Sequence, residues 1–66
     1  MSSVPQVKIT NEVTHREVAV WPLSQGIPRQ EEIVEDALQH KHMVTSVVWH
    51  IAHGTVTGVS VMISPL

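Results

Sequence analysis

The chain has no cysteine, no tyrosine and no phenylalanine among its 66 residues. Without cysteine it can form no disulfide, no thiolate zinc site and no thiol nucleophile. A domain of this size usually supplements its small core with disulfides, a metal or oligomerisation. Two routes therefore remain, which are a histidine metal site or burial against other copies of the chain. The lack of cysteine also fits a reducing compartment, so we expect a cytoplasmic protein.

Charge and aromatic side chains are scarce as well. The chain has four Lys/Arg against six Asp/Glu, and its only aromatic residues are Trp21 and Trp49. Nucleic-acid affinity depends on clustered positive charge that neutralises phosphates, often with aromatic rings on which bases stack. The basic residues form no cluster, so nucleic-acid binding is unlikely on sequence grounds; they are Lys8, Arg16, Arg29 and Lys41.

Long hydrophobic runs are also missing. No apolar stretch approaches the length needed to cross a bilayer, and no signal-peptide core follows Met1. We therefore expect no membrane partner. The length allows one small domain, residues 1–66, and no internal repeat is visible.

The first third of the chain has the pattern of two strands. Residues 4–10 alternate, with Val7 and Ile9 on one side and polar residues on the other. That period of two is typical of a half-buried strand. Residues 16–21 form a second predicted strand, and Pro22 ends it because proline cannot donate to a sheet ladder.

The middle of the chain resembles an amphipathic helix. Pro28 suits a first helical turn, acidic residues follow it, and basic residues lie near residue 41. At 100° per residue, four apolar side chains fall within an arc of roughly 140°. This pattern predicts a helix from Pro28 to about residue 42, with Ile33, Val34, Ala37 and Leu38 on its core face.

The last third, Val44 to Leu66, predicts a β-hairpin with a two-residue turn at His53-Gly54. In that register Ala52 lies opposite Thr55, and Trp49 lies opposite Gly58. A bulge would shift the register by one residue and exchange the faces. Without a bulge, one face carries Val47, Trp49, Ile51, Val56 and Met62, and the other carries Val44, Val48, Ala52, Val59, Val61 and Ile63.

Together these elements predict an α+β fold, a small antiparallel sheet in the order β-β-α-β-β with one helix packed on one face. One helix covers one face of a sheet, so the second apolar face of the hairpin would be left for another subunit. We therefore expect a homo-oligomer. The predicted interface residues are Val44, Val48, Val59, Val61 and Ile63.

Five histidines raise the alternative of a metal-binding module, because imidazole is a common metal ligand. The spacing argues against it, since neighbouring histidines two positions apart on a helix diverge by about 200°. Helix capping and turn positions explain the same residues, and we expect no cofactor. The alternative ligand set is His40, His42, His50 and His53.

No catalytic motif is present. There is no glycine-flanked serine of the nucleophile-elbow type and no phosphate-binding glycine loop. The sequence thus favours a non-enzymatic protein that binds a partner protein or a small ligand at subunit interfaces. A small enzyme with an inter-subunit site remains the other alternative. The candidate binding residues are Trp21 beside the Ser24–Gly26 loop, Arg29, Arg16 and His50.

Overall fold

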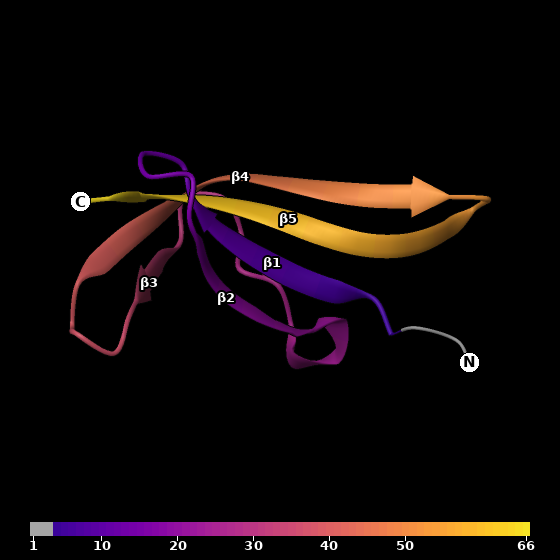
Figure 1. Ribbon diagram of the computed structural model, residues 1–66, viewed down its shortest axis with the longest axis horizontal. Helices are drawn as coiled ribbons and strands as arrows, with labels where there is room; N and C mark the ends of the chain where they lie inside the picture. Colours follow the sequence, from indigo (N-terminus) through magenta and orange to yellow (C-terminus); the bar gives the residue numbers. More distant parts are fainter. Residues whose placement is uncertain (1–3) are drawn as a thin grey trace.

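The computed structural model describes residues 4–66 and shows one curled, mixed five-stranded sheet (Figure 1). The strands lie in the order β2-β1-β5-β4-β3, and only the central β1–β5 pair is parallel. A short 3-10 turn, η1, follows β2. The bounds are β1 Gln6–Asn11, β2 Glu17–Pro22, η1 Leu23–Gln25, β3 Ile33–Glu35, β4 Lys41–Ala52 and β5 Thr55–Pro65.

The two N-terminal strands are confirmed. In β1, Val7 and Ile9 are buried while Gln6 and Lys8 are exposed, as the alternation requires. β2 ends at Pro22 and pairs antiparallel with β1, so these strands form the predicted hairpin. The connecting turn begins at Asn11, whose side-chain oxygen accepts the backbone N–H groups of residues 13 and 14.

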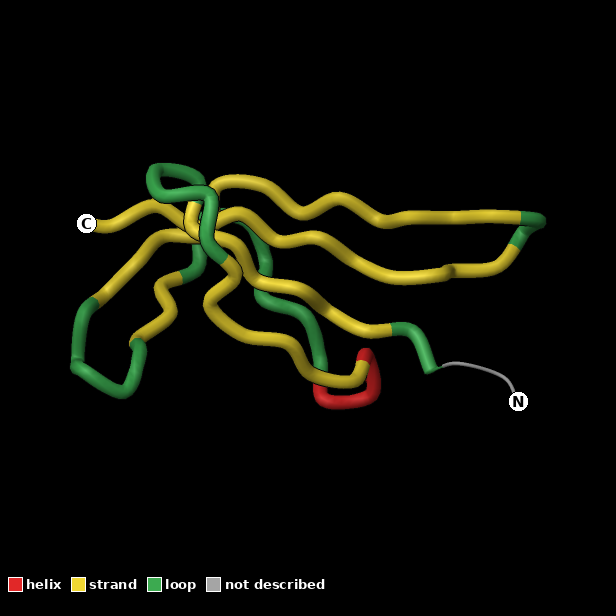
Figure 2. The backbone as a smooth tube through the Cα atoms, viewed as in Figure 1, coloured by secondary structure: helices red, strands yellow, loops and turns green. Residues whose placement is uncertain are grey.

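The predicted α+β fold is wrong, because the only helical segment in residues 4–66 is the three-residue η1, and no helix packs on a face of the sheet there (Figure 2). Glu31 and Gln39 have positive φ values of 72° and 64°, a backbone conformation that a right-handed helix cannot contain. Between them Ile33 and Val34 pair with β4 as strand β3. Both residues are β-branched, and such side chains are more restricted at χ1 in a helix than in an extended strand. Sheet pairing therefore prevails over the helical periodicity.

The C-terminal hairpin is confirmed in its turn but not in its register. Ala52 pairs with Thr55 across His53-Gly54, whereas Trp49 lies opposite Val59 rather than Gly58. Two bulges cause the difference. Thr45 is the extra residue on β4, and Thr57 is the extra residue on β5, where Gly58 faces His50.

The two bulges gather most apolar residues of the hairpin on one face. Directly paired residues share a face of a sheet, and the pairs here are Val44 with Ile63, Val47 with Val61 and Trp49 with Val59. The predicted separation into two apolar faces is therefore wrong. The opposite face is the more polar one, with Ser46 paired to Met62, Ser60 paired to Val48 and His50 paired to Gly58.

The core lies on the concave face of the curled sheet. Six side chains are buried there, all of them valine or isoleucine. The segment that joins β2 to β3 runs from one edge of the sheet to the other, and its Leu23 and Ile27 pack against this core. Residues 4–66 contain no helix that is long and apolar enough to cross a membrane. The buried residues are Val7, Ile9, Val44, Val59, Val61 and Ile63.

Candidate functional site

A cavity of about 270 Å³ lies between the two edge strands of the sheet. β2 and β3 are the opposite edges of the strand order, so the curl of the sheet places them on either side of this space. We call it the edge hollow. Its lining is mainly apolar, with two carboxylates and one imidazole; the residues are Ile9, Val18, Ala19, Trp21, Val34, Glu35, Asp36, Ala37, His42 and Ile63.

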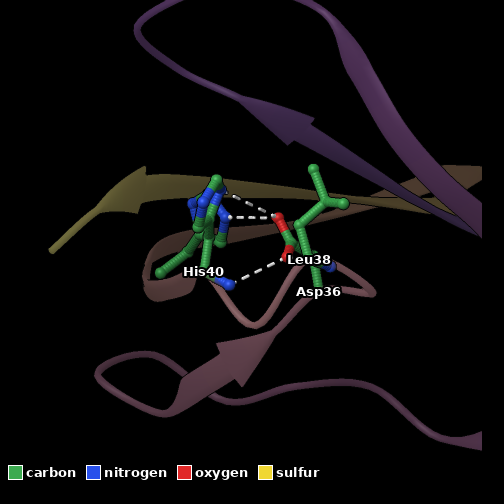
Figure 3. A network of polar contacts seen from close by, with 4 residues as sticks. Asp36, Leu38 and His40 are labelled. Atoms are coloured by element: carbon green, nitrogen blue, oxygen red, sulfur yellow. Dashed lines mark hydrogen bonds and ion pairs between the residues drawn. The ribbon is translucent and has the colours of Figure 1, made fainter.

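Asp36 organises the turn that forms one wall of the edge hollow. Its Oδ1 accepts the backbone N–H groups of Leu38 and His40, each at 2.9 Å (Figure 3). The turn is closed by Gln39, which has the positive φ, and its N–H donates to the Asp36 carbonyl at 3.0 Å. An aspartate that accepts backbone N–H groups just after itself stabilises such turns, which explains the loop at this position.

The same hydrogen bonds keep Asp36 ionised. The backbone N–H of His40 is the main cause that lowers the pKa of Asp36 below its ordinary value of 3.8, although partial burial acts in the opposite sense. The hydrogen bonds from the His42 ring and from the Leu38 N–H lower the pKa further, as does the charge of His40. A fixed carboxylate therefore lies on the wall of the edge hollow.

His42 is the one buried polar residue of the described chain, with 8% of its surface exposed. Its Nε2 lies 3.3 Å from Asp36 Oδ2, and its Nδ1 is buried with no hydrogen-bond partner. Placing the proton on Nε2 satisfies the carboxylate and leaves only a lone pair unmatched on Nδ1. His42 thus acts as a hydrogen-bond donor that holds Asp36 against the hollow.

The lining of the edge hollow contains no serine, threonine, cysteine or lysine, so the Asp36–His42 pair has no side-chain nucleophile beside it there. The buried Nδ1 is also covered by the protein, which keeps it from exchanging a proton with a substrate.

Trp21, which the sequence singles out as a binding residue, lines the edge hollow. Its Nε1 donates to the Gly26 carbonyl at 2.8 Å, so the loop after η1 fixes the plane of the indole ring. The other candidates lie elsewhere. Arg16 is exposed in the β1–β2 turn, and Arg29 lies in a separate groove beside Trp49. The structure therefore does not bring the predicted binding residues together.

His50 lies on the polar face, away from the edge hollow. Its Nε2 is 2.6 Å from Ser60 Oγ, and both residues line a shallow depression with Lys8. No carboxylate in residues 4–66 is hydrogen bonded to the other ring nitrogen of His50. Lys8 is itself paired with Glu17 at 3.8 Å. The His50–Ser60 pair therefore lacks the third group that orients a catalytic histidine.

The four histidines of the alternative metal set do not converge. His40 and His42 both approach Asp36, while His50 is bonded to Ser60 and His53 occupies the hairpin turn with a φ of 54°. Over residues 4–66 no group of three or more potential ligands could hold a metal ion.

Four of the five predicted interface residues form part of the intramolecular core. Val44, Val59, Val61 and Ile63 are fully buried within the chain, where another subunit could not reach them without opening the sheet. Val48 is the exception, since it lies exposed on the polar face.

Sequence reasoning missed the Asp36–His42 pair and the edge hollow. The helical interpretation gave no reason to pair Asp36 with a residue six positions later. The available signal was local, because aspartate itself favours the start of a turn. No known protein family, curated protein or solved structure matches this chain.

Proposed function

We propose that this protein is a non-enzymatic binding protein whose edge hollow holds a small, mostly apolar ligand that carries an ammonium group. The observation behind the proposal is the composition of the hollow, in which an apolar lining is combined with the carboxylates of Glu35 and Asp36. Small-molecule sites typically pair an apolar wall with a few fixed polar groups.

The charge of the hollow favours a cation over an anion. Neither lysine nor arginine lines it, and the imidazole of His42 is already engaged by Asp36. Hydrogen bonds to two backbone N–H groups hold the Asp36 carboxylate in place, so binding would not have to order it. Trp21 adds an aromatic ring, the other group that attracts ammonium ions in proteins.

The size of the hollow limits the ligand. A cavity of about 270 Å³ lies just below the usual range for drug-sized molecules, so a single ring or a short alkyl chain with an amine fits it best. Phenethylamine is a suitable probe. Its analogue 2-phenylethanol is uncharged, and its analogue phenylacetate carries a negative charge.

The test is an NMR titration of isotope-labelled protein with each of these three probes, in which the chemical shifts of the backbone amides and the tryptophan indoles are measured. We expect phenethylamine to shift the Trp21 indole and residues 34–37, with weaker binding of the alcohol and none of the carboxylate. Glu35→Gln should remove most of the preference for the amine, and Ala19→Leu should abolish binding because the larger side chain fills the hollow. Equal binding of all three probes, or shifts confined to other surfaces, would contradict the proposal.

A further inference from the structure

The β4–β5 hairpin projects beyond the rest of the sheet and leaves one side of β4 unpaired (Figure 1). β3 pairs with β4 only over residues 41–43, and Glu31 and Glu32 extend the backbone hydrogen bonds as far as Val44. Within residues 4–66, no backbone–backbone hydrogen bond reaches the outer side of β4 after Val44, although the side-chain amide of Gln30 donates to the Thr45 carbonyl at 3.3 Å. We call residues 46–52 on this side the free edge of β4.

A free edge of this kind is open to pairing with another strand. Its backbone N–H and C=O groups point outward at every second residue and form a template for β-sheet extension. Natural proteins usually block such edges with lysine, proline or a covering loop. The free edge of β4 has no charged residue and no proline, and residues 43–66 contain no Asp, Glu, Lys or Arg at all.

The side chains along the free edge are apolar and exposed. Trp49 and Ile51 are 50% and 66% exposed on the core side of the sheet, and Val48 is exposed on the other. Beside the inner end of this edge, Val47 and Trp49 line a groove together with the loop residues Ile27, Pro28, Arg29 and Gln30. An added strand would therefore gain backbone hydrogen bonds and cover apolar surface on both of its faces.

We infer that the free edge of β4 pairs antiparallel with the same edge of a second copy of this chain, which extends the sheet across a two-fold axis. Antiparallel pairing of one strand with itself is self-complementary, as a two-fold interface requires. Two identical charged edges would repel one another, but residues 46–52 contain no lysine, arginine or carboxylate; Arg29 lies beside the edge, in the groove at its inner end. The inference is independent of the edge hollow, which lies between β2 and β3.

The experiment is sedimentation velocity across a range of concentrations on the wild type, Ile51→Lys and Val13→Lys. Val13 is a matched control, since it is β-branched, 65% exposed and located in the β1–β2 turn. We expect the wild type and Val13→Lys to dimerise alike. Ile51→Lys should weaken the dimer about tenfold or more, because it places a charged ammonium group against the uncharged strand of the partner copy.

Val48→Lys provides a second variant on the other face of the strand and should weaken the dimer in the same way. Circular dichroism at low concentration checks that each variant remains folded. In the wild type, slowed amide exchange along residues 47–51 at high concentration should accompany dimerisation. A wild type that stays monomeric would overturn the inference. So would a dimer that neither lysine variant weakens, because its interface would then lie elsewhere.

Discussion

At the scale of single residues, Asp36 connects the local backbone to the site. Its carboxylate stabilises the turn after β3, accepts a hydrogen bond from the buried His42 and lines the edge hollow. One side chain thus positions a wall of the cavity and supplies part of its charge. The ionisation of the Asp36 carboxylate should therefore affect both the stability of the fold and ligand binding.

The lowered pKa of Asp36 predicts how stability depends on pH. Because the pKa is lower in the folded protein than in the unfolded chain, ionised Asp36 stabilises the fold above its ordinary value of 3.8. That stabilisation is lost as the pH falls through 3.8 and the lower pKa of the folded state. In Asp36→Asn the side-chain oxygen can still accept the Leu38 and His40 N–H groups, but the charge is gone.

Urea unfolding of the wild type and Asp36→Asn should therefore show a larger stability difference at pH 7 than at pH 3. Glu31→Gln removes the same formal charge and controls for net charge, since the Glu31 side chain forms no hydrogen bond or ion pair in the described structure. A difference between wild type and Asp36→Asn that is constant with pH would show that the turn depends on shape alone.

At the scale of elements, the C-terminal hairpin shows what local sequence can and cannot determine. The two-residue turn at His53-Gly54 was predictable, because a type I′ turn requires positive φ at both central residues and glycine tolerates this conformation. Both residues do have positive φ. The bulges at Thr45 and Thr57 were not, since nothing in either residue type distinguishes a bulged threonine from a regular one.

The turn also provides a prediction about stability. Gly54 has a φ of 75° and open space around its missing side chain, so Gly54→Ala should cost about 1 kcal/mol through backbone strain alone. His53→Asn should instead stabilise the hairpin slightly, because asparagine adopts positive φ more readily than most residues. Thermal and urea unfolding measure both changes.

The middle segment fails as a prediction for a different reason. Ile33, Val34, Ala37 and Leu38 satisfy a helical period, yet the same short stretch satisfies a strand followed by a turn. The choice depends on β4, whose edge offers backbone hydrogen bonds to residues 33–35. For the candidate site, Trp21 was recognisable from sequence, whereas the Asp36–His42 pair depends on this tertiary choice and was not.

At the scale of the whole molecule, stability depends on few side chains. Within residues 4–66 only six apolar residues are buried, and three of them lie on the central strand β5. The total stability of a 66-residue domain is expected to be roughly 3–10 kcal/mol. One core truncation can therefore remove a large part of it.

Two identical substitutions at different depths test this view. Ile63 is 1% exposed, so Ile63→Ala should cost about 2–5 kcal/mol and leave much of the protein unfolded at 37 °C. Ile33 lies on the edge strand β3 and is 50% exposed, so Ile33→Ala should cost less than about 1 kcal/mol. Similar losses in the free energy of unfolding, measured with urea, would mean that β3 contributes to the core as much as β5.

The parallel pairing of β1 with β5 also has a consequence for synthesis on the ribosome. β1 emerges before its partner β5, which follows the other four strands in the chain and pairs with β1 so that Val7 lies beside Val59 and Ile9 beside Val61. Contacts so distant along the chain slow folding, because a long loop must close before they form. The nascent β1–β2 hairpin should therefore expose its apolar face until β5 has emerged, and during that interval it is a natural substrate for chaperones that bind extended apolar segments.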